Sequence, residues 1–324
     1  MLAAPRLRRE PEIVMQQPAL ARWLEERLQR TLLHSQPVGG GCSHNAWRLE
    51  LHDGGRLFAK TNRAALLPVL EAEADGLAAL AAAAAAAGDS GPQIPSPLAC
   101  EQVEGQAVLV MEWLELGRPD HGNSATAWRE LGRGLARLHR ASCHNADGRY
   151  GWHQDNFIGS SPQPNGWQNS WASFFSERRL GAQLELARAQ RQALGGSGQL
   201  MEAATRWLEG HQPDPCLVHG DLWSGNAGLL RCGGSALFDP AVYRGDREVD
   251  LAMAQLFGGF PATFFEGYQN EWPLPAGHQQ RIALYNLYHL LNHANLFGGG
   301  YWQQCAASVR NISRGIPCEG SEPW

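Results

Sequence analysis

Apolar residues in the first fifth of the chain change from helical spacing to strict alternation. Residues 19–33 have large apolar side chains three or four positions apart, which predicts an amphipathic helix. These positions are Leu20, Trp23, Leu24, Leu28 and Leu32. After a run of glycines, Trp47, Leu49 and Leu51 alternate with polar residues and predict a strand. The sequence HDGG that follows is typical of a hairpin turn, so residues 56–62 are expected to form the return strand.

The remaining pattern predicts a small β-rich region followed by a large helical one. Residues 70–88 read as a helix that ends near Gly88, because alanine is the strongest helix former and glycine a common stop. Strands are expected through residues 100–114, and after Gly117 the periodicity is mostly helical. The expected helices cover residues 124–141, 180–209, 250–256 and 279–296. This order predicts an α+β protein with two lobes.

Length and composition are those of an ordinary globular enzyme. The 324 residues suffice for two lobes, which we place at residues 16–113 and 114–324, after an N-terminal tail at residues 1–15. A net charge of −5 without a basic block disfavours nucleic-acid binding. No segment has the roughly 18 apolar residues of a membrane span, and the N-terminus lacks the charge order of a signal peptide. Seven scattered cysteines without CxxC spacing favour a reducing, cytoplasmic location.

Lysine usage is strongly biased. Of the 27 basic residues, 26 are arginine and one is Lys60. A lysine that persists in such a composition is expected to be needed as a compact point charge, which the broad arginine fork cannot replace.

Five residues fit the chemistry of phosphoryl transfer from a nucleotide. In kinase catalytic loops a base Asp precedes a metal-binding Asn by five positions, the spacing of Asp221 and Asn226. Asp239 follows an apolar strand, where a second metal-binding Asp belongs. Lys60 lies on the expected phosphate-binding strand, and Glu73 on the next helix could pair with it. The order of these elements predicts a bilobal protein-kinase-like fold with residues 108–114 joining the lobes.

Each of these features alone has an ordinary structural explanation. An Asp and an Asn five positions apart are more often a solvated turn than a site, and a strand lysine is usually exposed. Glu73 could face water, and Glu71 beside it is a rival partner for Lys60. The run Gly39 to Gly41 lacks full G-x-G-x-x-G spacing and could be only a flexible turn. Only the occurrence of all these features together and in order favours a kinase.

Several stretches together resemble the fructosamine kinase family, which belongs to the aminoglycoside-phosphotransferase-like branch of the protein-kinase fold. They are HGDLWSGNAG, FDPAVYRGDREVDLAM, FGGFP and YNLYHLLNHANLFGGGY, with GGCS, FAKTN, EAEADGLAAL, VMEWL and GWHQDNFIGSSPQPNGWQNSW. The resemblance extends from about residue 19 almost to the C-terminus. It implies an ATP-dependent enzyme that phosphorylates the sugar 3-hydroxyl of a fructosamine or ribulosamine, free or on a glycated protein. The 3-phosphate then eliminates and frees the amine.

The resemblance also implies roles for individual residues. Asp221 would be the catalytic base, Asn226 and Asp239 would hold Mg²⁺, and Lys60 would bind phosphate, oriented by Glu73. The nucleotide would also meet Gly40, Gly41, Ser43, Met111, Glu112 and Leu114. Trp223 and His293 are candidates for substrate contact, although a packing Trp and a core His are common alternatives. His219 is expected to support the loop, and Asp250 to brace it by hydrogen bonds. Family members often carry a Cys at the position of Cys42, where an inert thiol is favoured over a redox-sensitive one.

Three other functions compete with this interpretation. A kinase of the same fold could act on an aminoglycoside, choline or homoserine, but the C-terminal helices lack the acidic cluster that an aminoglycoside requires. A non-catalytic pseudokinase would be expected to lose Lys60, Asp221, Asn226 or Asp239, and all four are present. A metal hydrolase would need further ligands, such as H-E-x-x-H, which the sequence lacks. We expect a monomer or weak dimer with ketosamines or glycated proteins as substrates.

Overall fold

The computed structural model describes residues 17–39, 44–88, 91–118, 124–143, 147–192 and 194–314. They form two compact units, one within Met1–Ala78 and Pro95–Leu114 and the other within Ala79–Ile94 and Glu115–Trp324. We call these the first and the second unit. The predicted N-terminal tail, residues 1–15, lies outside the described residues.

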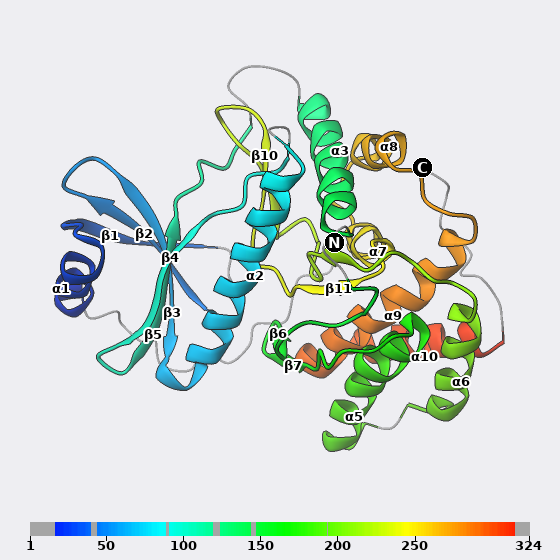
Figure 1. Cartoon of the computed structure of the whole chain (residues 1–324). Coiled ribbons are helices and arrows are strands. Elements are labelled where there is room, and N and C mark those ends of the chain that lie inside the picture. Colours follow the sequence, from blue (N-terminus) through cyan, green and yellow to red (C-terminus); the bar gives the residue numbers. More distant parts are fainter. Residues whose placement is uncertain are drawn as a thin grey trace. The chain divides into compact units, whose positions relative to one another are not determined.

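The first unit contains an antiparallel five-stranded sheet in the order β1-β2-β3-β5-β4 (Figure 1). Its strands are β1 (Leu32–Val38), β2 (Asn45–Leu51), β3 (Arg56–Arg63), β4 (Pro97–Val103) and β5 (Gln106–Glu112). Helix α1 (Gln17–Leu28) buries Leu20 and Leu24 in a core with Leu49 and Val110 of the sheet. The predicted hairpin at HDGG is confirmed, since β2 and β3 pair across it.

Helix α1 is shorter than the periodicity indicates. The predicted helix over residues 19–33 was wrong at its C-terminal end, because Gln29 has a φ of 53° and the chain then enters β1. Leu32 pairs with Leu51 of β2, so backbone pairing in the sheet takes these leucines out of the helix. The short 3₁₀ turn η1 (Ala64–Leu66) and helix α2 (Leu67–Ala86) follow β3, and Gly88 at a φ of 94° stands just past the helix end, as predicted.

The second unit is mainly helical. Its helices are α3 (Ser124–Cys143), α4 (Trp171–Ser173), the π-helix η2 (Phe174–Gly181), α5 (Ala182–Ala189), α6 (Ser197–Leu208), α7 (Glu248–Leu256), α8 (Ala262–Glu271), α9 (His278–Phe297) and α10 (Gly300–Ser313). Helices α3 and α8 pack side by side (Figure 1). The helix expected over residues 180–209 is in fact interrupted, because Arg191 and Gly196 have positive φ between α5 and α6.

Short strand pairs in the second unit carry the loops of interest. They are β6 (Asn156–Ile158) with β7 (Ser161–Gln163), β8 (Cys216–Val218) with β11 (Tyr243–Gly245), and β9 (Ala227–Leu229) with β10 (Ser235–Leu237). Residues on β8, β11, α7 and α9 contribute to one aromatic and aliphatic core. Because β8 contributes to this core and β9 pairs with β10, the segment between them has fixed ends.

Candidate active site

A buried carboxylate holds the segment between β8 and β9 by hydrogen bonds. Asp250 of α7 accepts hydrogen bonds from the backbone N–H of His219 (2.7 Å to Oδ2) and of Gly220 (2.8 Å to Oδ1). Its Oδ2 also lies 3.1 Å from His139 Nε2. Burial works against the charge of Asp250, but the hydrogen bonds and the neighbouring histidines outweigh it and lower its pKa. The predicted bracing role of Asp250 is confirmed in its hydrogen bonds.

Gly220 cannot be replaced without moving this loop. Its φ is 80°, and a Cβ on it would lie 2.1 Å from the carbonyl oxygen of Ala241. The Ala241 N–H donates to the His219 carbonyl at 2.9 Å, and His219 Nε2 lies 3.0 Å from the Phe238 carbonyl oxygen. The loop is thus joined directly to the segment after β10, and His219 has the supporting contacts that were expected of it.

The β9–β10 hairpin brings Asn226 and Asp239 to the same end of the loop. Ala227 pairs with Leu237, so Asn226 directly precedes the hairpin and Asp239 is the second residue after it. The Asn226 side-chain amide donates to three oxygens, the Asp221 carbonyl (2.9 Å), Asp221 Oδ2 (3.1 Å) and the Asp239 carbonyl (3.3 Å). Asp239 has a φ of 57°, a left-handed conformation that Asp adopts more readily than most residues. The spacing of five residues brings Asp221 and Asn226 together, and the hairpin brings Asp239 to the same place.

The electrostatic surroundings of Asp221 suit a proton acceptor. Burial raises its pKa to about 7, and the negative charge of Asp239 adds to the effect, while the hydrogen bond from Asn226 opposes it. A carboxylate with a pKa near the working pH combines a useful ionised fraction with appreciable basicity.

Lys60 and Glu73 form a buried ion pair in the first unit. Lys60 Nζ lies 2.7 Å from Glu73 Oε1, and both side chains are about nine-tenths buried. Glu73 rather than Glu71 is therefore the partner that the structure brings to Lys60. A buried ammonium on a central strand, matched by one carboxylate, is the arrangement expected of a lysine that binds phosphate.

The oxygen atoms of Asn226 and Asp239 fit a hard divalent cation. Because the Asn226 amide nitrogen donates to three acceptors, its Oδ1 is the atom that can meet a ligand. Amide and carboxylate oxygens are the ligands that Mg²⁺ prefers in proteins.

The residues predicted to meet adenine have different surroundings. Met111 is buried on β5, with 2% of its surface exposed. Glu112 is tied to Ser96, since its N–H donates to the Ser96 carbonyl and its carboxylate accepts from the Ser96 N–H, both at 3.1 Å. Leu114 follows the strand and belongs to neither a helix nor a strand. The predicted contacts of Gly40, Gly41 and Ser43 lie outside the described residues.

The two substrate candidates occupy different parts of the second unit. The half-buried Trp223 ring covers Gly225, where a Cβ would be 2.3 Å from the ring. His293 on α9 packs among Phe257, Phe297 and Tyr301, and its Nδ1 is 2.9 Å from the His289 carbonyl oxygen. Because a carbonyl only accepts, Nδ1 carries the proton and Nε2 is left as an acceptor. Burial lowers the pKa of His293 and keeps the ring neutral.

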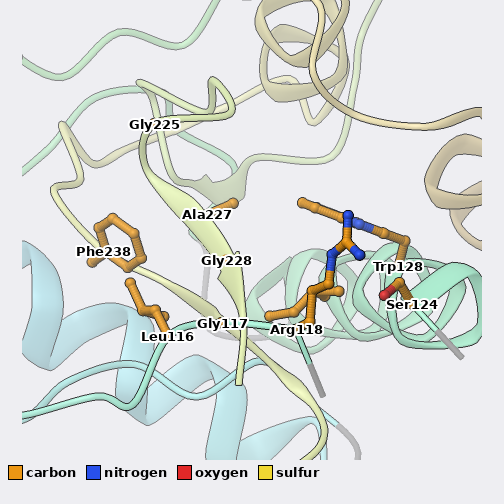
Figure 2. A pocket seen from close by; sticks show the side chains of 10 residues that line it. Leu116, Gly117, Arg118, Ser124, Trp128, Gly225, Ala227, Gly228 and Phe238 are labelled. Atoms are coloured by element: carbon orange, nitrogen blue, oxygen red, sulfur yellow. The ribbon is translucent and has the colours of Figure 1, made fainter. Parts of the chain in front are cut away.

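A pocket of about 550 Å³ lies beside the loop within the second unit (Figure 2). It is lined by Leu116, Gly117, Arg118, Ser124, Trp128, Gly225, Ala227, Gly228, Leu229 and Phe238. Gly225 and Phe238 directly precede Asn226 and Asp239 in the sequence, so this space adjoins the candidate metal ligands. Arg118 and Trp128 were not predicted from the sequence, because their positions before and on α3 have no distinctive pattern.

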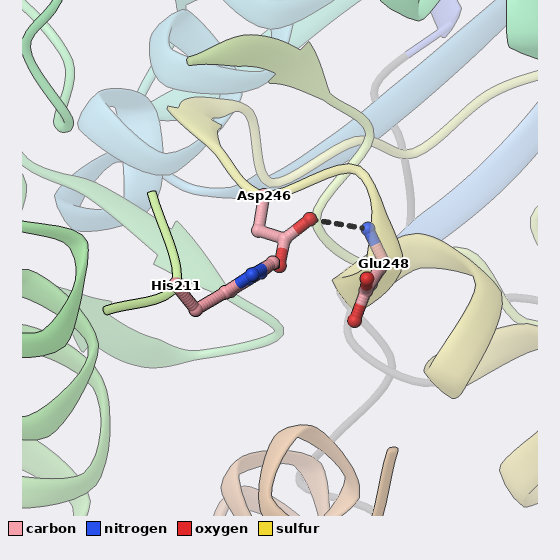
Figure 3. A group of neighbouring side chains, drawn as sticks. All are labelled: His211, Asp246 and Glu248. Carbon is pink, nitrogen blue, oxygen red and sulfur yellow. Dashed lines mark hydrogen bonds and ion pairs between the residues drawn. The ribbon is translucent and has the colours of Figure 1, made fainter. Parts of the chain in front are cut away.

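A second cluster of polar residues, not predicted from the sequence, lies at the N-terminus of α7. His211, Asp246 and Glu248 have polar atoms close enough to share a metal ion (Figure 3). However, Arg281 makes two 2.7 Å hydrogen bonds to the Glu248 carboxylate, and Asp246 accepts from His211 (2.7 Å), Tyr285 (2.6 Å) and the Glu248 N–H (3.0 Å). These contacts already satisfy both carboxylates, which identifies the cluster as a structural anchor for α7 and α9.

The active-site loop, the buried Lys–Glu pair and the order of the elements define a protein of the kinase-like phosphotransferase class. Comparison with solved structures agrees. A fructosamine-3-kinase candidate from Haemophilus somnus superposes with a TM-score of 0.81 and 27% identity, covering 91% of this chain and 97% of that one. An aminoglycoside phosphotransferase has a TM-score of 0.60 at 16% identity, over 91% of this chain and 99% of the other, and so shares the fold alone.

Sequence comparisons identify the family. The fructosamine kinase family profile matches residues 16–314. A probable ketoamine kinase of Synechocystis sp. is 45% identical over 278 residues, which are 86% of this chain and 89% of that protein. The chloroplastic protein-ribulosamine 3-kinase of Arabidopsis thaliana is 38% identical over 281 residues, 86% of this chain and 82% of that protein. The chain belongs to the fructosamine kinase family and is an ATP-dependent phosphotransferase that acts on a hydroxyl group. No helix in the described part of the chain has the length and apolarity needed to cross a membrane.

Proposed function

We propose that the enzyme transfers the γ-phosphoryl group of ATP to the sugar 3-hydroxyl of a ketosamine, a ribulosamine or fructosamine adduct of an amine or a protein lysine. The observation that carries this proposal is the position of Asp221 in a braced loop, beside Asn226 and Asp239 and with a pKa of about 7. Relatives named ketoamine kinase and protein-ribulosamine 3-kinase support the substrate class.

In this proposal Asp221 takes the proton of the acceptor hydroxyl as the oxygen attacks the γ-phosphorus and ADP leaves. Positioned proton acceptors of this kind contribute about 10²–10⁴-fold to rate. Asn226 Oδ1 and the Asp239 carboxylate would hold Mg²⁺, which would offset charge on the phosphate oxygens. The Asn226 amide holds the Asp221 carboxylate in place through its 3.1 Å hydrogen bond.

Several further residues are proposed to contact the nucleotide. Lys60 binds the α- and β-phosphates, and Glu73 fixes the direction of its ammonium group. Adenine meets the Glu112 carbonyl and the backbone of Leu114, because the Glu112 N–H is already bonded to Ser96, with Met111 behind the strand. Gly40, Gly41 and Ser43 are proposed to cover the phosphates. We assign the pocket beside Asn226 and Asp239 to the nucleotide as well.

The acceptor side is proposed to involve Trp223 and His293. Trp223 lies two residues after the base and presents a half-buried ring on which a sugar could stack. A neutral His293 with a free Nε2 lone pair can accept a hydrogen bond from a sugar hydroxyl.

The test is ADP release by the purified enzyme with Mg²⁺ and ribuloselysine, fructoselysine, an aminoglycoside or buffer alone, together with NMR of the product. We expect turnover on at least one ketosamine and phosphate on the sugar 3-oxygen. Asp221→Asn should lose at least about 10²-fold in kcat. Asp147→Asn changes an exposed carboxylate in the same unit and should retain activity. Turnover on the aminoglycoside alone, or full activity of Asp221→Asn, would contradict the proposal.

A further inference from the structure

Two cysteines far apart in the sequence meet in the second unit. Cys143 is the last residue of α3 and Cys216 the first residue of β8, and their sulfur atoms are 2.8 Å apart across 73 sequence positions. A disulfide bond is about 2.05 Å long, so less than 1 Å of movement separates this contact from a covalent bond. Cys143 is partly exposed, whereas Cys216 has no exposed surface.

The two thiols have different reactivity. The hydrogen bond with Cys216 lowers the pKa of Cys143 although burial and the charge of Asp214 oppose it, and the positive charge of Arg244 adds to the lowering. Burial raises the pKa of Cys216 well above its ordinary value. Thiolate character and access together decide which cysteine reacts first, so Cys143 is the attacking thiol and Cys216 the resolving one.

Arg244 holds the backbone on both sides of this pair. Its Nη1 donates to the carbonyl of Ser142 (2.9 Å) and to that of Pro215 (3.4 Å), the residues that directly precede the two cysteines. The Leu217 N–H also donates to Ser142 Oγ at 2.9 Å. The end of α3 and the start of β8 are therefore fixed next to each other before any covalent bond forms.

We propose that Cys143 and Cys216 form a reversible intrachain disulfide that cross-links α3 to the strand leading into the active-site loop. With hydrogen peroxide as oxidant, the Cys143 thiol loses its proton, its thiolate attacks one peroxide oxygen, and the O–O bond breaks. A sulfenic acid forms, and the departing hydroxide takes up the released proton to give one water. The Cys216 sulfur then attacks the Cys143 sulfur, the S–O bond breaks, and a second water leaves with the Cys216 proton. Two thiols lose two electrons in total, and the peroxide gains them.

The cross-link should stabilise the second unit. Closing a loop of this length restricts the unfolded chain, and because the folded chain already holds the sulfurs in contact, little distortion opposes the gain. We expect the melting temperature to rise by about 5 °C or more on oxidation and to return on reduction with dithiothreitol.

The test uses the full-length protein without nucleotide, treated with stoichiometric hydrogen peroxide, alkylated, digested without reduction and mapped by mass spectrometry. We expect one peptide pair joined through Cys143 and Cys216, together with the rise in melting temperature. Cys143→Ser should abolish both. Cys232→Ser removes an exposed thiol of the same unit and should abolish neither.

Two results would overturn the proposal. The first is wild-type protein in which peroxide leaves Cys143 alkylated or converts it to sulfinic acid, with no peptide joined to Cys216. The second is an oxidation-dependent rise in melting temperature that persists in Cys143→Ser. Peptide mapping of the wild type decides the matter even where a serine variant does not fold, and neither readout depends on phosphoryl transfer.

Discussion

The raised pKa of Asp221 implies that this carboxylate, which we propose as the catalytic base, destabilises the fold when it is ionised. An Asp carboxyl has an ordinary pKa of 3.8, and burial and the charge of Asp239 raise that of Asp221 to about 7. Between these values the folded protein holds a proton that the unfolded chain has released. Stability therefore falls as the pH rises from about 4 to about 7, and the loss is complete above pH 7.

The size of this effect follows from the shift. Each pKa unit corresponds to about 1.36 kcal/mol, so the full cost of the ionised form above pH 7 is at most about 4 kcal/mol. Asp221 retains some contact with water, which reduces the cost, and a range of about 1–4 kcal/mol is reasonable. Asp221→Asn keeps the shape and the hydrogen bond with Asn226 but removes the charge. It should therefore be more stable than the wild type and nearly inactive.

The assay is thermal and urea unfolding of both proteins in EDTA, because a bound cation would offset the charge of Asp221. The stability gain of Asp221→Asn should be larger near pH 8 than near pH 5 by up to about 2.5 kcal/mol, or several degrees in melting temperature. Asp147→Asn is the matched control, since the pKa of this exposed carboxyl is lowered by Arg149 and its loss brings no gain near pH 8. A gain that is equal at both pH values, or a loss of stability near pH 8, would refute the reasoning.

Other substitutions test the ion pair and the close packing of the loop. Lys60→Arg should lower kcat/KM for ATP by at least about tenfold in steady-state kinetics, because the buried space beside Glu73 fits a compact ammonium group; activity equal to the wild type would show that charge alone suffices. Glu73→Gln should also lower kcat/KM for ATP, and by less than Lys60→Arg if the Lys60 ammonium keeps its direction. Gly220→Ala should destabilise by more than about 3 kcal/mol in urea unfolding, because its Cβ would meet the Ala241 carbonyl at 2.1 Å. Gly210→Ala, at the same φ of 80° with no atom within 4 Å, should cost only about 1–2 kcal/mol; equal losses at the two glycines would show that the close approach is unimportant.

Sequence patterns correctly predicted the turns and helices that depend on interactions between residues close in the sequence. The HDGG turn and the alternation before it led to the β2–β3 hairpin, and continuous helical spacing led to α9 (His278–Phe297). The predictions of secondary structure were wrong where pairing with residues distant in the sequence determines the backbone conformation. Leu32 has helical spacing with Leu28, yet it joins the sheet because Leu51 offers a strand to pair with. The gap between α5 and α6 depends on positive φ angles at Arg191 and Gly196. A positive φ at an arginine cannot be predicted from the sequence.

The candidate site was predictable for a related reason. Asp221 and Asn226 are close in the sequence, and the hairpin that returns Asp239 to them spans few residues, so spacing alone constrained their geometry. Lys60 was indicated by composition, being the one lysine among 27 basic residues. The partners of Glu248 and Asp246 were not predictable, because Arg281 and His211 reach them from other elements and belong to residue types that are usually exposed.

The same distinction explains why the contact between two cysteines was not predicted. Seven scattered cysteines with no short spacing favoured a reducing location over a disulfide framework, and spacing in sequence does not show which cysteines meet in the fold. Cys143 and Cys216 meet because α3 ends beside the start of β8, an arrangement fixed by the contacts of His139 on α3 with Asp250 and of Ser142 with Leu217. Asp250 also binds the loop that carries Asp221. The contacts that hold the Asp221 loop therefore also bring the two thiols together, and a disulfide at this place would reinforce the arrangement that positions the proposed base.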